Sequence, residues 1–222
     1  MTTSYPLGRL PARDPRDRQF LMATLLDIEP PPLRSVSYRA GPILDQGNTP
    51  SCVGHGWRAW LNGAPIRQLG GPSAMAIYKE AQDVDEWDGN AYEGTSVRAG
   101  ARVLAAKGHI VSYFWSFDEL TVRRWMLNKR GGVVIGVNWY PSMFTPITGG
   151  FLTIKGRPVG GHCVWVRGYN RPLDAYHIQN SWGPDWGVRG QAWLRSADMA
   201  RLISEDGECC CGVEAYVSTR GT

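Results

Sequence analysis

The sequence predicts an α+β fold with two lobes, on three observations. Before residue 131 the apolar residues recur at helical spacing, whereas after residue 132 they form short β-type runs. The chain has 222 residues, which is enough for one large domain or for two lobes that share a core. We therefore expect a helical first lobe, followed by a β-rich second lobe.

Four segments of the first lobe are predicted to be helices. They are 52–62, 72–82, 95–107 and 117–129. In the first of them Trp57, Trp60 and Leu61 are spaced for one buried face. The third is opened by Thr95 or Ser96 as a capping residue and closed by Gly108.

The second lobe begins where Gly131 and Gly132 interrupt the helical pattern. The segments after them concentrate or alternate apolar residues as strands do. These predicted strands are 133–137, 162–169, 175–179 and 190–195.

We divide the chain into three parts. Residues 1–45 are rich in Pro and Arg and predict an extended arm that docks on the body. Residues 46–130 form the predicted helical lobe, and residues 131–222 the predicted β-rich lobe. The interface between the two lobes is the place where a functional site is expected.

Composition limits the classes of partner and location. The net charge of +4 comes from Arg spread along the chain without a basic run, so we expect no nucleic-acid partner. No apolar run approaches the length of a transmembrane helix, so we expect no membrane partner. The opening residues lack the pattern of a signal peptide, and five cysteines suit no even disulfide framework. A cytoplasmic location is expected.

Cys52 is the candidate nucleophile. It follows Ser51 at the start of a predicted helix, where free backbone N–H groups and the positive end of the helix dipole stabilise a thiolate. A free cysteine is more often a small buried hydrophobe, so this position alone does not identify a catalytic residue.

His162 and Asn180 supply the two other functions that a thiol acyl-transfer enzyme needs. His162 follows two glycines and enters an apolar strand, which would hold its ring rigidly as a base. Asn180 ends another strand, and its amide is suited to accept the ring N–H and fix the tautomer, with Trp182 shielding that bond from water. Gln46 lies six residues before Cys52, so its amide and the Cys52 N–H are able to donate to one oxyanion.

In these segments the chain resembles the papain-like cysteine peptidases. The resemblance rests on Gln46-Gly47 with Ser51-Cys52, on Gly161-His162, and on 180–190, which follows the family's Asn-Ser-Trp-Gly, Trp-Gly and closing Gly pattern. The segment 7–17 also looks like the front of compact bacterial and phage-type members.

The resemblance implies a two-lobed papain-like fold whose β-rich lobe is antiparallel and barrel-like. It implies Cys52 as nucleophile, His162 as base and acid, Asn180 as orienter and Gln46 as oxyanion donor. Ser51, Gly161 and Trp182 are expected to contact a peptide or protein substrate. No cofactor and no metal is expected.

The segment before the nucleophile departs from the family pattern. Thr49 stands where the family has the cysteine of a structural disulfide, Pro50 where it has a flexible glycine, and Val53 where it has tryptophan. The Cys52–His162 spacing of 110 residues is shorter than the roughly 130–150 typical of papain relatives. Loops are therefore shorter here, and the arm is the segment able to replace the inhibitory pro-region of secreted relatives.

Three functional hypotheses follow. The first is a peptidase that forms a thioacyl intermediate on Cys52. The second is a catalytically silent or occluded component of a larger assembly, such as a virus particle. The third is acyl transfer to an amine instead of water, through the same residues.

Other candidate residues carry weaker signals. His55 lies one helical turn after Cys52, but a base is better held on the opposite lobe. His109 and His177 have the character of surface or packing residues. Residues 208–211, Glu-Cys-Cys-Cys, suggest a metal site, yet adjacent cysteines wrap poorly around one tetrahedral ion. Packing, or one disulfide, is expected there.

Overall fold

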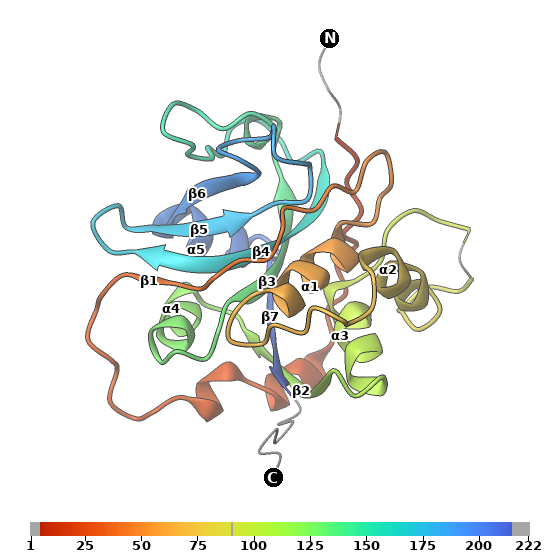
Figure 1. Cartoon of the computed structure of the whole chain (residues 1–222), viewed down its shortest axis with the longest axis horizontal. Helices are drawn as coiled ribbons and strands as arrows, with labels where there is room; N and C mark the ends of the chain where they lie inside the picture. Colours follow the sequence, from red (N-terminus) through yellow and green to blue (C-terminus); the bar gives the residue numbers. More distant parts are fainter. Residues whose placement is uncertain (1–4, 90, 215–222) are drawn as a thin grey trace.

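The computed structural model describes residues 5–89 and 91–214 (Figure 1). Helices α1 (Cys52–Asn62), α2 (Ala74–Gln82) and α3 (Val97–Ala106) gather on one side of the molecule. An antiparallel sheet with helix α5 (Ser196–Ser204) occupies the other side. This is the α+β arrangement that the sequence predicts.

The predicted helices are all present, and the starts of all but α1 are set by capping side chains. Ser73, Ser96 and Asp118 each accept a hydrogen bond from the backbone N–H three residues later, so α2, α3 and α4 (Glu119–Leu127) begin just after them. These three predicted ranges each began two residues early, because they included the cap and the residue before it. Trp57, Trp60 and Leu61 are buried, as their spacing predicts.

The sheet has the strand order β2-β7-β3-β4-β5-β6, and its neighbouring strands pair antiparallel. Its strands are β2 (Ile110–Ser116), β3 (Val133–Trp139), β4 (Gly160–Asn170), β5 (Ala175–Gln179), β6 (Gln191–Arg195) and β7 (Glu208–Glu214), and the short β1 (Val36–Ser37) pairs with β4. Within the described residues β2 and β6 are edges, so the sheet is open and barrel-like only in a loose sense.

Strand β7 was missed by the sequence patterns, together with β2 and α5. It lies between β2 and β3 and carries Cys209, Cys210 and Cys211, all fully buried. All five cysteines of the chain lie in the described part and are free thiols. The cysteines of β7 therefore act as small core residues. Of the two possibilities expected for this segment, packing and a disulfide, the structure shows packing.

Eight of the ten tryptophans are buried and fill the interior. They are Trp57, Trp60, Trp115, Trp125, Trp139, Trp165, Trp182 and Trp186. Helix α1 packs against β3 and β4. The Cys52 thiol at its start lies beside the backbone N–H of Cys163, near the start of β4. No helix among the described residues is both long and apolar enough to cross a membrane.

Candidate active site

Cys52 is the first residue of α1, and its side chain is fully buried. The loop before it is held by local bonds: the Gly47 N–H donates to Asp45 Oδ1 at 2.9 Å, and Gly47 takes a positive φ of 54°. The hydroxyls of Thr49 and Ser51 lie 2.7 Å apart. The Ser51 hydroxyl is thus turned into the loop and does not face outward; its substrate contact stays a prediction.

His162 and Asn180 come from neighbouring strands, the first near the start of β4 and the second directly after β5. His162 Nε2 lies 2.7 Å from Asn180 Oδ1. The same oxygen accepts the Ser181 N–H at 2.8 Å, which identifies it as the carbonyl end of the amide. The imidazole must therefore donate from Nε2, and in the neutral ring Nδ1 is left as the proton acceptor.

Two tryptophans fix the His162 ring. Trp182 stacks on it with centroids 4.3 Å apart and an interplanar angle of 27°, and Trp139 meets it edge-on at 4.7 Å. Trp182 thus has the shielding position that the sequence predicts. The His162 Nδ1 atom is buried and has no hydrogen-bond partner among the described residues.

Burial keeps both candidate groups neutral. It raises the pKa of the Cys52 thiol to about 12, although backbone N–H groups of Cys163, Gly8 and Val53 act in the opposite direction. It lowers the pKa of His162 to about 3, although the hydrogen bond that His162 donates to Asn180 acts in the opposite direction. In this closed state the pair is a thiol and a neutral imidazole.

Gln46 joins the two halves of the site. Its backbone N–H donates to the Ser181 carbonyl at 2.8 Å, and its Oε1 accepts the Ser181 hydroxyl at 2.7 Å. Its Nε2 donates to the Thr49 carbonyl at 2.8 Å and to the Pro6 carbonyl at 3.1 Å. The amide predicted to bind an oxyanion is thus directed at a carbonyl oxygen of the arm.

Residues 5–8, called here the tip of the arm, cover the candidate catalytic residues. Tyr5 stacks on Trp182 with centroids 4.4 Å apart. The Gly8 N–H donates to the Gly161 carbonyl at 3.2 Å, and the Gly8 carbonyl accepts the Thr95 N–H at 2.9 Å. The predicted contact residues Gly161 and Trp182 therefore do bind a peptide segment, but in this structure it is the chain's own.

Gly8 passes the nucleophile loop at a distance that only glycine permits. A Cβ built on Gly8 would lie 1.8 Å from the Pro50 carbonyl oxygen, and one on Gly94 would lie 2.5 Å from the Gly8 carbonyl oxygen. Because these are backbone atoms, no side-chain rotation would relieve either contact. Pro50, which departs from the family pattern, forms one wall of this passage.

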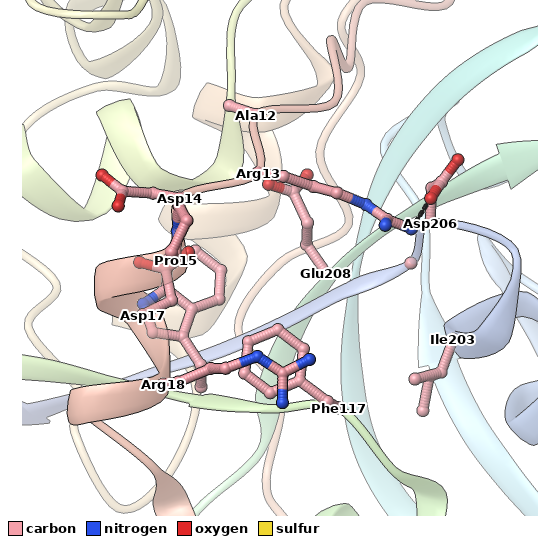
Figure 2. A pocket seen from close by; sticks show the side chains of 12 residues that line it. Ala12, Arg13, Asp14, Pro15, Asp17, Arg18, Phe117, Ile203, Asp206 and Glu208 are labelled. Carbon is pink, nitrogen blue, oxygen red and sulfur yellow. Dashed lines mark ion pairs between the residues drawn. The ribbon is translucent and has the colours of Figure 1, made fainter.

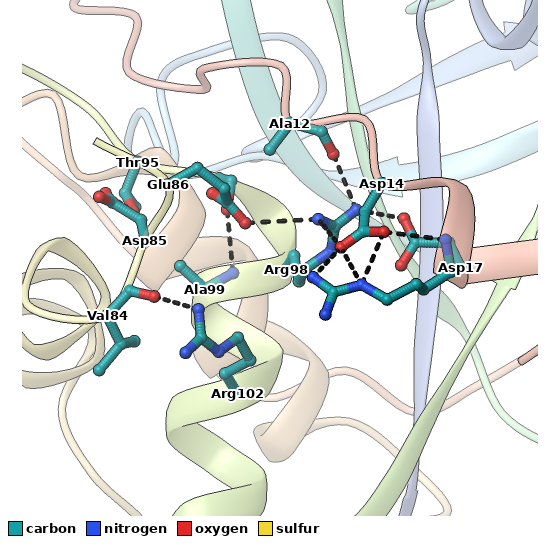
Figure 3. A network of polar contacts seen from close by, with 12 residues as sticks. Ala12, Asp14, Asp17, Val84, Asp85, Glu86, Thr95, Arg98, Ala99 and Arg102 are labelled. Carbon is teal, nitrogen blue, oxygen red and sulfur yellow. Dashed lines mark hydrogen bonds and ion pairs between the residues drawn. The ribbon is translucent and has the colours of Figure 1, made fainter. Parts of the chain in front are cut away.

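Residues 9–17, called here the anchor, are held by buried ion pairs. Arg9 Nε lies 2.8 Å from Glu208 Oε2. Arg98 of α3 binds Asp17, the Ala12 carbonyl and Asp14 together (Figure 3). The arm is thus fixed to both the helices and the sheet.

The base of the anchor borders a cavity of about 280 Å³ (Figure 2). Its walls come from the anchor, the end of β2 and the turn between α5 and β7. An exposed ion pair between Arg13 and Asp206 spans its edge. This cavity holds none of the predicted site residues, so it is separate from the candidate active site.

The three other histidines have structural partners. His55 Nδ1 lies 3.0 Å from the Ser51 carbonyl, His109 Nδ1 lies 3.0 Å from Gln68 Oε1, and His177 stacks on Trp193 at 4.2 Å. Within the described residues no group of three or more His, Cys, Asp or Glu side chains is arranged to hold a metal ion.

Comparison with known proteins gives matches among solved structures only. No family model and no curated protein sequence matches the chain. Xylellain, a cysteine protease from Xylella fastidiosa, superposes with a TM-score of 0.73 at 15% identity over 97% of this chain and 99% of that one. Digestive procathepsin L2 from Tenebrio molitor gives 0.67 at 16% identity, over 94% of this chain and 78% of that one. Procathepsin B from Trypanosoma congolense gives 0.61 at 15% identity, over 96% and 84%.

All three are cysteine proteases of the papain type, and each alignment spans most of both chains. The chain therefore has the papain-like fold that the sequence predicts.

Proposed function

We propose that this protein is a cysteine peptidase that hydrolyses peptide bonds through a thioacyl intermediate on Cys52. One observation carries the proposal: Asn180 accepts the Nε2 proton of His162 and leaves Nδ1 as a buried acceptor with no partner in the described part of the chain. A histidine held in that tautomer beside a helix that begins with cysteine is suited to take the thiol proton. The papain-like fold of the chain supports the same conclusion.

In the proposed mechanism the Cys52 proton moves to His162 Nδ1, and the sulfur attacks the carbonyl carbon of the substrate. The Gln46 amide and the Cys52 N–H, unpaired at the start of its helix, donate to the developing oxyanion. His162 then returns the proton to the leaving nitrogen as the C–N bond breaks. Water attacks the thioester with His162 again as base, which releases the acid and restores the thiol.

The tip must leave the site before a substrate enters. The tip occupies the hydrogen-bonding groups of the Gln46 amide and the Gly161 carbonyl. It also excludes the water that would stabilise a thiolate and an imidazolium. We therefore propose that the chain is latent while the tip is seated.

The test uses the full chain with a Gly8→Ala substitution, because a Cβ there collides with the Pro50 carbonyl and displaces the tip. Gly70→Ala is the matched control, since a Cβ at that position meets nothing within 4 Å. We expect Gly8→Ala to cleave an unfolded protein substrate, and Cys52→Ala in the same background to abolish cleavage. Cleavage that survives Cys52→Ala would end the proposal.

A second candidate is an occluded structural or binding component of a larger assembly, such as a virus particle. It is favoured by the close fit of the tip, which fills the site with glycine against backbone. If this candidate is correct, Gly8→Ala will expose Cys52 to an alkylating reagent, yet the thiol will react no faster than free cysteine and no peptide will be cleaved.

A further inference from the structure

Cys163 is a second buried thiol beside the candidate nucleophile. It follows His162 in β4, and its backbone N–H lies next to the Cys52 thiol. Both cysteines are fully buried, and neither forms a disulfide. The proposed mechanism gives the Cys163 side chain no role, so the reason for a thiol at this position has to be sought elsewhere.

The Cys163 side chain points toward α1. A Cβ built on Gly56 would lie 2.8 Å from Cys163 Sγ, and Gly56 follows Cys52 by one turn of that helix. Residues four apart share one face of a helix, with their Cβ atoms about 5–6 Å apart. The sulfur of Cys163 therefore lies against the same face of α1 that carries Cys52.

These contacts bring the two thiols within reach of each other. The Cys163 nitrogen is next to Cys52 Sγ, and only Cα and Cβ separate that nitrogen from Cys163 Sγ. A disulfide joins residues whose Cα atoms are roughly 4.4–6.8 Å apart, a separation that fits a helix packed directly on a strand. Gly56 carries no side chain that would block rotation of Cys163 toward Cys52.

Charge decides which of the two thiols reacts first. Cys52 begins a helix, where free N–H groups stabilise a thiolate once the tip withdraws. Burial raises the pKa of Cys163 well above its ordinary value, and a negative charge on Cys52 raises it further. Cys163 therefore stays protonated while Cys52 is a thiolate. When an oxidant converts Cys52 into a neutral group, this repulsion ends and Cys163 is able to react.

We infer that Cys163 is a resolving thiol, which captures oxidised Cys52 in a reversible Cys52–Cys163 disulfide and so protects the nucleophile from irreversible oxidation. The oxidant is a hydroperoxide such as hydrogen peroxide. The inference rests on the proposed function in one respect, namely that release of the tip exposes Cys52 as a thiolate. It does not require that Cys52 cleave peptides.

The reaction has two steps. The Cys52 thiolate attacks one peroxide oxygen, the O–O bond breaks, and hydroxide leaves, which gives a sulfenic acid. The Cys163 sulfur then attacks the Cys52 sulfur, the S–O bond breaks, and the leaving hydroxide takes the Cys163 proton and becomes water. Overall the two thiols lose two electrons and two protons, and the peroxide is reduced to two molecules of water.

The test treats the full chain carrying Gly8→Ala with hydrogen peroxide. Free thiols are then alkylated, and the protein is digested without reduction and mapped by mass spectrometry. We expect one linked pair of peptides, which contains Cys52 and Cys163, and a loss of cleavage activity that dithiothreitol reverses. In the natural chain the linked pair should form at least about tenfold more slowly, because burial under the tip keeps Cys52 protonated.

Cys163→Ala, added to Gly8→Ala, tests the role of the second thiol. Without it the sulfenic acid should proceed to sulfinic acid, so that less than about a tenth of the activity returns with dithiothreitol. Cys209→Ala is the matched control, because Cys209 is equally buried. Gly136 lies opposite both Cys163 and Glu208, so Cys209, the next residue, faces the other side of the sheet. The control should recover like its parent.

Two results would overturn the inference. One is recovery of the Cys163→Ala chain equal to that of the control, which would indicate that the backbone nitrogen at this position, and not the thiol, captures Cys52. The other is absence of the linked pair after peroxide in both Gly8→Ala and Gly94→Ala, two chains with a natural Cys163. Because that measurement needs no change at Cys163, a poorly folded variant does not obscure it.

The same experiment distinguishes this inference from the proposed function. A linked pair in a chain that cleaves no substrate before oxidation would retain the inference and end the peptidase proposal. Cleavage by a chain that forms no linked pair would do the reverse.

Discussion

The tip and the anchor of the arm are neighbours in sequence but are held by different forces. The tip, residues 5–8, is held by backbone hydrogen bonds and by one aromatic stack. The anchor, residues 9–17, is held by ion pairs of Arg9 and Arg98 with buried carboxylates. Removing one member of a buried ion pair typically costs several times more than losing an exposed contact. We therefore expect the site to open by release of the tip while the anchor stays bound.

The largest effect is expected from the anchor. Arg98→Met would leave Asp17 without its cation and Asp14 with Arg16 alone, and burial already raises the pKa of Asp17. We expect the free energy of unfolding to fall by about 3–5 kcal/mol, measured by urea denaturation. Arg16→Ala is the control, because its pair with Asp14 is at the surface and should give no measurable change. If Arg98→Met were as stable as the control, the anchor would not differ from the tip.

Alanine substitutions at two glycines distinguish the effect of backbone strain from the effect of displacing the tip. Gly94 and Gly108 both have positive φ, 98° and 73°, but only a Cβ on Gly94 meets the tip. We expect Gly94→Ala and Gly108→Ala each to lose about 1 kcal/mol of stability from strain. Only Gly94→Ala should accelerate alkylation of Cys52, and equal acceleration in both variants would contradict a steric cover.

The smallest effect is expected from the aromatic stack. Tyr5→Ala removes the contact with Trp182, a type of interaction that contributes about 0.5–1.5 kcal/mol. Cys52 should therefore be alkylated roughly two- to tenfold faster, with little change in melting temperature. Phe20→Ala is a suitable control, because Phe20 is a half-exposed aromatic residue of the arm outside the tip. A Tyr5→Ala protein that melted as early as Arg98→Met would erase the distinction between tip and anchor.

The parts of the fold that could be predicted are those with a local cause. Helix α1 matched its predicted range because one face of it is apolar, and the other predicted helices differed by one or two residues at their ends, at and next to the caps. Strand β7 had no such signal, since three consecutive cysteines neither alternate nor resemble a typical apolar run. Its central position depends on pairing with β2 and β3, which are far away in sequence.

In the candidate site, too, residues with a local sequence motif could be predicted, whereas contacts between distant parts of the chain could not. Gln46, Cys52, His162 and Asn180 were identified from short motifs, and the His162–Asn180 contact has the expected geometry. Their catalytic roles stay predictions. Arg9 and Glu208 were missed as a pair because 199 residues separate them, and no spacing rule relates them. The course of the tip was missed for the same reason, since its glycine fits a wall that only the folded chain creates.

The most direct test is the pH profile of Cys52 alkylation by iodoacetamide, in the natural chain and in Gly8→Ala. With the tip seated, burial raises the thiol pKa to about 12 and lowers that of His162 to about 3. The natural chain should therefore react slowly at neutral pH, and its rate should rise about tenfold per pH unit without a plateau below pH 10. With the tip displaced, water and His162 stabilise the thiolate, so Gly8→Ala should reach its plateau below the ordinary thiol pKa of about 8.5. Identical profiles, or a plateau below pH 8 in the natural chain, would contradict a site covered by its own arm.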